Sequence, residues 1–418
     1  MAGTDTVWIA AALSDADRQA ASRGVIEADG IRARTLAIDS TVMTQAYDGV
    51  CNSMLWFLYH GLHDLSRRPV IDKGFRVAWE AYRRYNRAFA DVVADESPDG
   101  AVVLVQDYHL ALLGPLLREK RPDLATVHFS HTPFAPPHLM RVLPHDLATE
   151  LLVGMAGHNA CGFHSDRWAR DFRNSCEEIA GITPTTFVAP LAPDADDIRG
   201  VASSDRCQAE TEAIDTDLGD RRLIVRVDRI ELSKNLLRGF RAYDTMLQDR
   251  PDLRETVVFR ALGYPSREGL PEYLAYRAEI ESLAAVINHR WATPGWNPIE
   301  LDLVDDFPKS VAHLRRYDVL MVNPIRDGLN LVAMEGPLVN ERDGAVVLSR
   351  EAGVHDALNG AVHSVNPFDI EDQALALAAA LDMDAATRAS RAAELRRRAE
   401  ARNPSDWLSD QLAAAQAG

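Results

Sequence analysis

The sequence lacks several features that mark whole classes of protein. Its 418 residues include no uninterrupted apolar stretch of about 18 residues, which disfavours a membrane-spanning helix. The first residues, Met1–Asp5, carry no basic region ahead of an apolar run, so we expect no secretory signal. The few cysteines include no CxxC spacing and indicate reduced thiols in a cytoplasmic protein: Cys51, Cys161, Cys176 and Cys207.

Positive charge is also in the minority. The chain has 45 Lys and Arg against 62 Asp and Glu, a formal net charge of -17. A general nucleic-acid-binding protein needs a basic face, so this balance disfavours that class. It remains compatible with a local basic pocket for a small phosphorylated ligand.

Motifs for metal and covalent chemistry are missing as well. There is no HExxH and no Cys/His cluster, so we predict no zinc site. There is no GxSxG elbow for a serine nucleophile and no GxxxxGK[ST] phosphate loop. Repeats of 20–50 residues are not evident either.

What the chain does contain is a recurring unit: a short apolar run, a polar loop and an amphipathic stretch. The apolar runs are residues 101–105, 126–130, 223–227, 257–262, 319–322 and 345–349. This alternation predicts an α/β fold with parallel sheets covered by helices. In such sheets ligands bind beyond the carboxyl ends of the strands, where these polar loops fall.

A change of composition near 190–222 indicates a domain boundary. The segment is rich in Pro and acidic residues, and a second α/β unit opens at Leu223. We therefore predict an N-terminal domain over 1–197, a C-terminal domain over 198–384 and a helical tail over 385–418. Within the tail, the Ala-, Arg- and Glu-rich stretch from about Ala385 to Arg402 predicts one exposed or docking helix.

The segment Arg326–Glu335 is the most specific candidate site. Gly328 permits a tight turn. Asn330 and the residues after it can open a helix whose free N–H groups bind a diphosphate. Glu335, about two turns into that helix, could accept hydrogen bonds from ribose hydroxyls. By spacing alone, an ordinary capped helix with Asp327 and Asn330 as turn residues is an equally available interpretation.

Arg229 and Lys234 place two cations at a strand end. Two such charges suit a diphosphate leaving group, whose negative charge grows as the donor bond breaks. The alternative is a pair of solvated loop residues.

Two further groups of residues suit a sugar. Tyr47 and Trp56 are aromatics with a polar tip, which often line sugar sites, although half-buried core packing is the alternative. Asp107 and His131 follow adjacent strands and could bind sugar hydroxyls. A histidine at a strand end is also often structural.

Together these segments resemble the trehalose-6-phosphate synthases, retaining glycosyltransferases of GT-B architecture with two Rossmann-like domains. The resemblance runs from about Trp8 to about Asp382. The family's acceptor-site aromatics match Tyr47 and Trp56. Its "HDYHL" aspartate matches Asp107, and its histidine before "IPFP" matches His131.

The donor-site motifs match in the same order. The family's "RLDYSKG" pair corresponds to Arg229 and Lys234, and an arginine that holds acceptor phosphate corresponds to Arg267. The "RDGMNLVAKE" loop corresponds to Arg326–Glu335. There the resemblance implies that Asp327 faces donor sugar hydroxyls. It also implies that the backbone of the loop binds the diphosphate and that Glu335 binds the ribose. The implied donor-binding set is Asp327, Gly328, Leu329, Asn330, Leu331, Val332 and Glu335.

The resemblance also implies a mechanism. A nucleotide-activated hexose, with UDP or GDP left open, binds mainly to the C-terminal domain, and glucose 6-phosphate to the N-terminal domain. The C1 bond breaks through an oxocarbenium-like state, the acceptor attacks from the same face, and the leaving phosphate takes its proton. Arg229, Lys234, Asp107 and His131 form the implied catalytic set. We expect no cofactor and no essential metal, and leave homo-oligomerisation open.

Three departures from the family pattern stand out. The chain starts too late to contain the opening strand and glycine-rich loop of family members, which implies truncation, altered acceptor recognition or reduced activity. Met334 stands where the family often has Lys. Glu231 and Asn235 replace Asp and Gly in the Arg/Lys segment.

Two other hypotheses remain open. One is a related pseudo-glycosyltransferase, which joins a nucleotide-cyclitol to an aminocyclitol phosphate through a C–N bond. Residues 338–343 resemble those enzymes as well as some bacterial synthases. The other is a non-catalytic protein that binds a sugar phosphate or nucleotide, suggested by the missing glycine loop.

Overall fold

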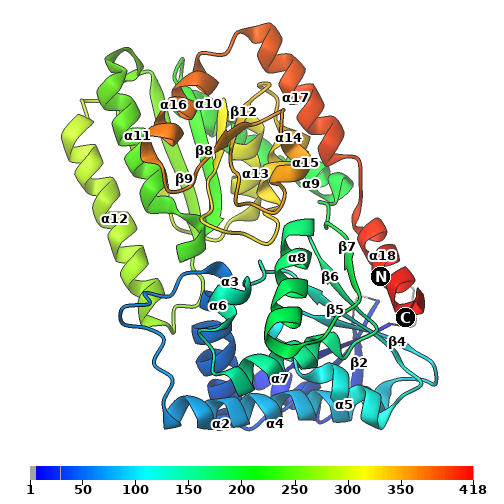
Figure 1. Cartoon of the computed structure of the whole chain (residues 1–418). Coiled ribbons are helices and arrows are strands. Elements are labelled where there is room, and N and C mark those ends of the chain that lie inside the picture. The colour runs from blue at the N-terminus through cyan, green and yellow to red at the C-terminus, as the bar shows by residue number, and fades with distance from the viewer. Residues whose placement is uncertain (1–5, 29, 418) are drawn as a thin grey trace. The chain divides into compact units, whose positions relative to one another are not determined.

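The computed structural model describes residues 6–28 and 30–417, and the chain divides into two units (Figure 1). The first unit comprises residues up to Phe163, Trp168–Val188 and the chain from Gln411. The second comprises His164–Arg167 and Ala189–Asp410. The domain boundary predicted after residue 197 therefore lies slightly beyond Ala189, where the long segment of the second unit begins.

The first unit contains a four-stranded parallel sheet in the order β4-β5-β6-β7. Its strands are β4 (Val102–Gln106), β5 (Ala125–Ser130), β6 (Ala160–Phe163) and β7 (Thr186–Val188). Helices α4 (Lys73–Glu96) and α5 (Leu113–Lys120) run beneath this sheet in the view of Figure 1. The remaining larger helices of this part are α7 (His145–Ala156) and α8 (Asp166–Ser175).

A second, smaller sheet belongs to the same unit. Strand β3 (Ile31–Leu36) pairs in parallel with β1 (Val7–Ala11) and antiparallel with β2 (Val25–Ala28). The short elements of this region are α1 (Asp15–Ala21), α2 (Ser40–Met43), a π-helical segment η1 (Thr44–Leu55), α3 (Trp56–His60), η2 (Tyr108–Leu110), α6 (Pro137–Met140) and η3 (Cys176–Ala180).

The second unit is built on one six-stranded sheet in the order β10-β9-β8-β11-β12-β13, and every pairing in it is parallel. The strands are β8 (Arg222–Arg229), β9 (Val257–Tyr264), β10 (Ile299–Asp302), β11 (Val319–Val322), β12 (Ala345–Ser349) and β13 (His363–Val365). The first strand, β8, lies between β9 and β11, so the chain winds in opposite directions on its two sides. Such a switch point opens a crevice at the carboxyl ends of β8 and β11.

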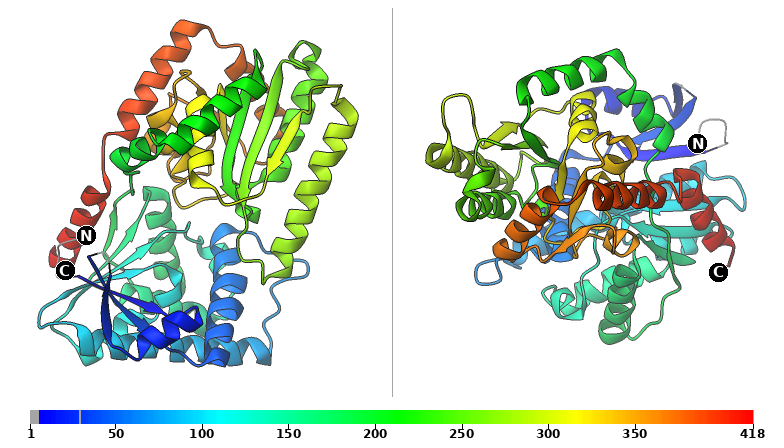
Figure 2. Two further views of the ribbon diagram at one scale, coloured as in Figure 1. Left: turned by 180° about the vertical axis from the view of Figure 1, so that it is seen from behind. Right: turned by 90° about the horizontal axis from the view of Figure 1, so that it is seen from above.

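Helices cover both faces of this sheet, and Figure 2 shows the long strands between α10 and α12. The helical elements are α9 (Ala195–Ala202), α10 (Asp205–Leu218), η4 (Leu232–Lys234), α11 (Leu236–Asp249), η5 (Pro251–Leu253), α12 (Pro271–Trp291), α13 (Phe307–Arg316), α14 (Val332–Val339), α15 (His355–Leu358) and α16 (Ile370–Leu381). Strands such as β11 and β12 are buried along their whole length, because a parallel sheet is packed on both faces. The prediction of helix-covered parallel sheets is confirmed.

The C-terminal segment forms two helices, α17 (Ala385–Ala399) and α18 (Pro404–Ala417). The first is close to the helix predicted from about Ala385 to Arg402.

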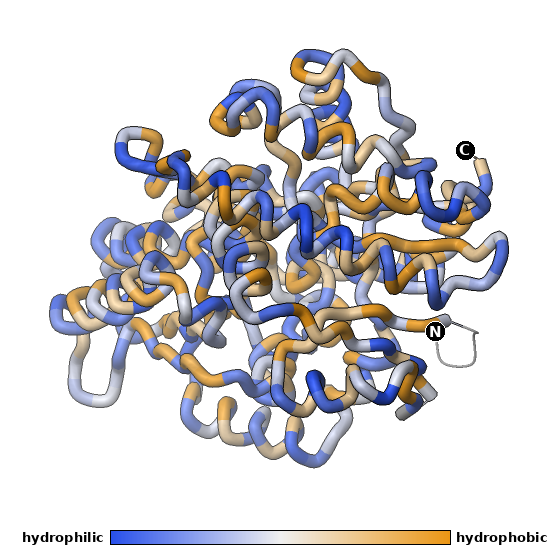
Figure 3. Tube along the Cα trace, turned by 90° about the horizontal axis from the view of Figure 1, so that it is seen from below, coloured by the Kyte–Doolittle hydropathy of each residue, from blue (hydrophilic) through white to orange (hydrophobic). Residues whose placement is uncertain are grey.

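Hydrophobic and hydrophilic residues alternate at short intervals along the chain in Figure 3. In the residues that the structure describes, no helix is both long enough and apolar enough to span a membrane. All four cysteines are buried and free.

Candidate functional site

Lys234 and Asp327 meet at the carboxyl ends of β8 and β11. Lys234 ends the short helix η4 after β8, and its Nζ donates a hydrogen bond of 2.6 Å to Asp327 Oδ2. Both side chains are largely buried, at 12% and 14% exposed. Two residues that are 93 positions apart in the sequence are therefore in contact, in the crevice where the alternation of strands and loops places a ligand.

The charge of Lys234 is maintained by its neighbours. Burial alone would lower its pKa, but the carboxylates of Asp327 and Asp228 outweigh that effect and raise the pKa above its ordinary value. Lys234 is thus a fixed cation at neutral pH. A fixed, partly desolvated cation stabilises a phosphate oxygen more strongly than a solvated lysine does.

The loop after β11 is shaped by the side chain of Asp327. Asn330 Nδ2 donates to Asp327 Oδ2 at 3.1 Å, and the N–H of Leu329 points at Asp327 Oδ1 at 3.4 Å. The N–H of Asp327 itself donates to the carbonyl of Glu351 at 3.1 Å. Asn330 has a φ of 77°, a conformation that Asn tolerates better than most residues. The turn-residue alternative for Asp327 and Asn330 thus describes the local geometry correctly, while Asp327 also contacts Lys234.

Close backbone packing fixes this loop against the next one. A Cβ atom added at Gly353 would lie 1.9 Å from the carbonyl oxygen of Gly328. The N–H of Gly353 donates to the carbonyl of Asp327 at 3.0 Å. Any larger residue at 353 would push the two loops apart, because the obstacle is backbone and cannot rotate away.

Helix α14 starts later than the sequence analysis expected. Its first residue is Val332, with Leu331 as the N-cap, so Asn330 lies in the loop before it. Glu335 falls in the first turn of the helix, which corrects the expectation of about two turns in. The N–H groups of Met334 and Glu335 already donate to the Leu331 carbonyl, at 2.8 and 2.9 Å. The N–H groups of the first two helical residues are therefore the usual place for an anion. Burial raises the pKa of Glu335, so hydrogen-bond donors there would be favourable.

A buried carboxylate, Glu231, joins the two arginines of the predicted site. Its Oε1 lies 3.3 Å from Arg229 Nη1 and 3.2 Å from Arg267 Nη1, and its side chain is only 2% exposed. Arg267 also donates to the Tyr273 hydroxyl at 2.7 Å. Arg229 is the most accessible of the three charged groups, with 46% of its side chain exposed. Two of the predicted phosphate-binding arginines are therefore held near each other by one carboxylate.

Arg226 and Asn235 support the segment of Lys234; the sequence analysis named Asn235 only as a departure from the family pattern and did not name Arg226. Arg226, with 1% of its side chain exposed, pairs with Asp228 at 2.6 Å and donates to the backbone carbonyl of Lys234 at 2.8 Å. Asn235, at a φ of 62°, donates through Nδ2 to the carbonyls of Asn323 and Pro367. A charged and an amide residue next to the predicted cation were visible in the sequence, but their partners were not.

In the first unit, Asp107 and His131 also come together. The N–H of His131 is directed at Asp107 Oδ1 at 3.3 Å, and His131 Nε2 lies 2.8 Å from Gln106 Oε1. Burial lowers the pKa of His131, although Asp107 opposes this. Because Nε2 donates to the Gln106 amide oxygen, Nδ1 of the neutral imidazole is an acceptor, as the carboxylate is, and both suit the O–H donors of a sugar.

The backbone at Asp107 is strained. Its φ of 64° and ψ of 175° lie in a region that residues other than glycine rarely occupy. The conformation is held by a hydrogen bond from its N–H to the Phe129 carbonyl, 2.8 Å, and by His128 Nε2 on its carbonyl, 3.1 Å. Strain maintained in this way is common where a side chain must point in a functional direction.

The two acceptor-site aromatics occupy different environments. Tyr47, on η1, is half-buried and stacks on His109 with ring centroids 4.9 Å apart. Trp56 is 2% exposed and stacks on His60 at 4.2 Å. The burial of Trp56 agrees with the core-packing alternative. A role of Trp56 in binding the acceptor stays a prediction. Tyr47 retains an accessible surface.

Among residues 6–28 and 30–417, no group of three or more His, Cys, Asp or Glu side chains is arranged to hold a metal ion. The site residues of the second unit are Arg229, Lys234, Arg267 and the loop 327–335, and those of the first are Tyr47, Trp56, Asp107 and His131.

Comparison with known proteins identifies the family to which the chain belongs. The model of glycosyltransferase family 20 matches residues 2–417 of the chain. The chain belongs to glycosyltransferase family 20. The predicted relationship to the trehalose-6-phosphate synthases and the prediction of a transferase are thereby confirmed.

Sequence relatives agree with this assignment. A trehalose-6-phosphate synthase of Mycobacterium sp. (strain KMS) is 31% identical over 422 residues, covering 94% of this chain and 84% of the relative. A UDP-forming α,α-trehalose-phosphate synthase of Schizosaccharomyces pombe is 32% identical over 364 residues, covering 83% of this chain and 69% of the relative. These names do not favour the pseudo-glycosyltransferase hypothesis.

Solved structures extend the likeness to three dimensions. A UDP-forming α,α-trehalose-phosphate synthase from Burkholderia xenovorans, in complex with glucose-6-phosphate, is 27% identical with a TM-score of 0.86 and covers 94% of this chain and 88% of that chain. A UDP-forming synthase from Burkholderia vietnamiensis is 26% identical with a TM-score of 0.88 and covers 99% of each chain. The GT-B fold predicted for this family 20 chain is confirmed.

Proposed function

We propose that the chain transfers glucose from UDP-glucose to glucose 6-phosphate, with retention at C1, to give α,α-trehalose 6-phosphate and UDP. The observation that carries this proposal is the contact of Lys234 with Asp327 beside Arg229, at the carboxyl ends of β8 and β11. It is supported by the UDP-forming relatives and by the solved relative with bound glucose-6-phosphate.

In this proposal the second unit handles the charge of the donor. Lys234 and Arg229 neutralise the diphosphate as the bond from C1 to the phosphate oxygen breaks. Asp327, which bonds Lys234 in the present structure, turns toward hydroxyls of the donor sugar. The N–H groups at the start of α14 bind diphosphate oxygens, and Glu335 binds the ribose hydroxyls.

The acceptor is bound by the residues that the family motifs assign to it. Tyr47, Trp56 and Arg267 bind glucose 6-phosphate, with Arg267 on its phosphate. Asp107 and His131 bind sugar hydroxyls. The acceptor oxygen forms the new bond to C1 from the face that the diphosphate leaves, and its proton passes to the departing phosphate oxygen. No protein nucleophile and no metal ion is required for these steps.

One assay tests the proposal directly. Purified chain is incubated with glucose 6-phosphate and UDP-, GDP- or ADP-glucose, in buffer with and without a chelator. We expect UDP release matched by a non-reducing disaccharide phosphate, detected by NMR, with little effect of chelation. Nucleotide release without disaccharide, or turnover with none of the hexose donors, would overturn it.

We also propose a cytoplasmic location, which the four buried free cysteines support. Cell fractionation with a tagged chain tests this, and a signal in a secreted or membrane fraction would contradict it.

A further inference from the structure

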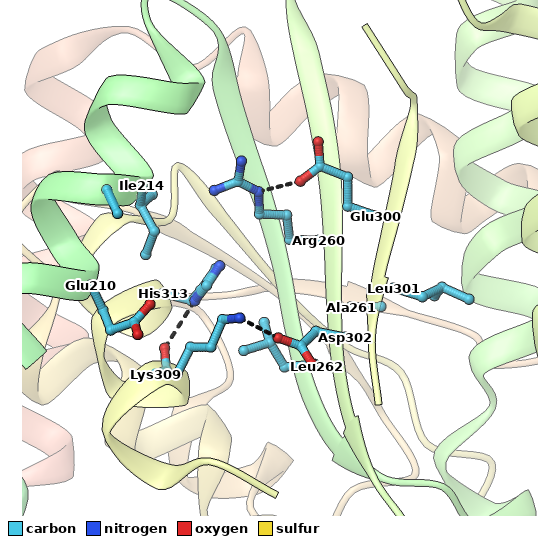
Figure 4. Close-up of a pocket in the computed structure, with 11 residues that line it drawn as sticks. Glu210, Ile214, Arg260, Ala261, Leu262, Glu300, Leu301, Asp302, Lys309 and His313 are labelled. Carbon is cyan, nitrogen blue, oxygen red and sulfur yellow. Dashed lines mark hydrogen bonds and ion pairs between the residues drawn. The ribbon is translucent and has the colours of Figure 1, made fainter. Parts of the chain in front are cut away.

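A cavity of about 340 Å³ lies in the second unit, apart from the residues discussed so far. It is bounded by β9 and β10 on one side and by α10 and α13 on the other (Figure 4). Charged side chains line it together with the apolar side chains of Ile214 and Leu262. The proposed transfer uses none of these residues.

Strand register places this cavity on the face of the sheet opposite to Arg226, the residue that supports Lys234. Arg226 on β8 is paired with Ala261 on β9, and Val225 is paired with Arg260. Side chains alternate between faces along a strand, so Arg226 and Arg260 point to opposite sides. Arg226 faces α11, where it lies against Gly239, whereas Arg260 faces the cavity.

Carboxylates outnumber cations around the cavity. Arg260 pairs with Glu300 at 2.7 Å and with Asp217. Lys309 pairs with Asp302 at 2.5 Å. Glu210 lines the same space and has no ion pair or hydrogen bond among the residues that the structure describes. It acts on the charge of Lys309 through space, without a contact. The four carboxylates outnumber the two cations, so the group as a whole attracts positive charge.

A buried histidine adds an acceptor without a partner. His313 is 4% exposed, and its Nδ1 donates to the backbone carbonyl of Lys309 at 2.9 Å. That bond leaves Nε2 as the acceptor atom of the neutral ring. Within the described part of the chain Nε2 has no hydrogen bond, and Figure 4 shows the ring directed between Lys309 and Arg260 into the cavity. Burial lowers the pKa of His313 to about 4, so the ring is neutral near pH 7.

We infer that this cavity binds a small aliphatic ammonium compound. The ammonium group has donors only, and it meets two acceptors that lack partners, His313 Nε2 and the Glu210 carboxylate. The methylene groups of the ligand lie against Ile214 and Leu262, which lose contact with water. An anion is disfavoured here, because the carboxylates in and around the cavity outnumber its two cations.

The probe for the test is 1,4-diaminobutane, with 1,4-butanediol as its uncharged counterpart. Calorimetric titration of the full chain measures the affinity for each. We expect saturable one-site binding of the diamine and none of the diol. Absence of saturable diamine binding, or equal binding of the diol, overturns the inference.

Matched variants locate the site. Glu210→Gln removes the partnerless carboxylate, and we expect at least about tenfold weaker diamine binding. Glu212→Gln removes the same charge from the exposed side of α10, and binding should stay within about twofold. His313→Leu, checked for an unchanged melting temperature, should weaken binding by a similar factor to Glu210→Gln. Equal affinities for the Glu210 and Glu212 variants would show general electrostatic attraction and refute the site.

Binding and transfer are separable in this test. The diamine titration is carried out without nucleotide or sugar, so a failed glucosyl-transfer assay leaves its outcome unchanged. Conversely, loss of diamine binding in Glu210→Gln should leave turnover with UDP-glucose as it was.

Discussion

In the second unit the predicted site residues are charged and paired, with Lys234 bound to Asp327 and Arg229 close to Glu231. In the first unit the backbone N–H of His131 is directed at Asp107, and its ring donates to the Gln106 amide oxygen. Charge at low exposure suits a phosphate whose own charge changes during reaction. A neutral imidazole beside a carboxylate offers acceptors, which suit the O–H donors of a sugar. In the proposed transfer, the second unit therefore supplies electrostatic stabilisation and the first unit supplies positioning.

The Lys234→Ala substitution is expected to have the largest effect on the second unit and tests its electrostatic role. Loss of a fixed cation at the diphosphate should lower kcat by roughly 100-fold or more. Steady-state assays with UDP-glucose measure this, and Lys120→Ala is the control, because Lys120 forms only a surface pair with Asp91. A reduction of less than about threefold would contradict the role of Lys234.

Glu231→Gln tests whether one carboxylate organises two arginines. The Gln amide oxygen can still accept a hydrogen bond but carries no charge, so Arg229 and Arg267 repel each other, and we expect kcat/KM to fall by about tenfold for both substrates. Glu281→Gln, at a surface pair with Arg277, should leave it unchanged. An effect on one substrate alone would show that the two arginines act independently.

Arg267→Ala and Tyr47→Ala sharpen the division between donor and acceptor. We expect the KM for glucose 6-phosphate to rise about tenfold and the KM for the donor to change by less than about threefold. Initial rates over a grid of both substrates separate the two constants. Equal effects on donor and acceptor would overturn the assignment of these residues to the acceptor.

The last prediction concerns stability and has no expected effect on turnover. Burial lowers the pKa of His128, in the first unit, to about 4 in the folded chain, against about 6.5 when unfolded. The unfolded state therefore binds the extra proton first, and stability present above about pH 6.5 declines as the pH falls toward 4. The contribution of His128 is roughly 3 kcal/mol over that window.

Melting temperatures of His128→Gln across this range measure the effect. The variant should lose less stability than the parent between pH 6.5 and pH 4. His289→Gln, at an exposed histidine, should follow the parent curve. A parallel decline in all three proteins would show that His128 does not titrate in this way.

The sequence predicted the chemistry of individual loops better than the contacts that hold those loops in place. Spacing identified Arg229 and Lys234, and the structure brings them to the Asp327 loop as that spacing suggested. The position of Glu335 within its helix was wrong because Leu331, not Asn330, is the N-cap. The burial of Trp56 could not be deduced, because an aromatic on a helix looks the same whether it faces a ligand or the core.

By itself, the sequence determined the alternation of buried strands and polar strand ends, and with it the parallel sheets and the edge where ligands bind. These properties depend on residues that are neighbours in the chain, whose spacing sets which face of a strand or helix is apolar. Only the tertiary structure decided that Glu231 lies between Arg229 and Arg267, and that Glu210 and His313 share a cavity. Such contacts join residues far apart in the chain, and the balance of burial and charge that sets their pKa values exists only after the sheet has assembled.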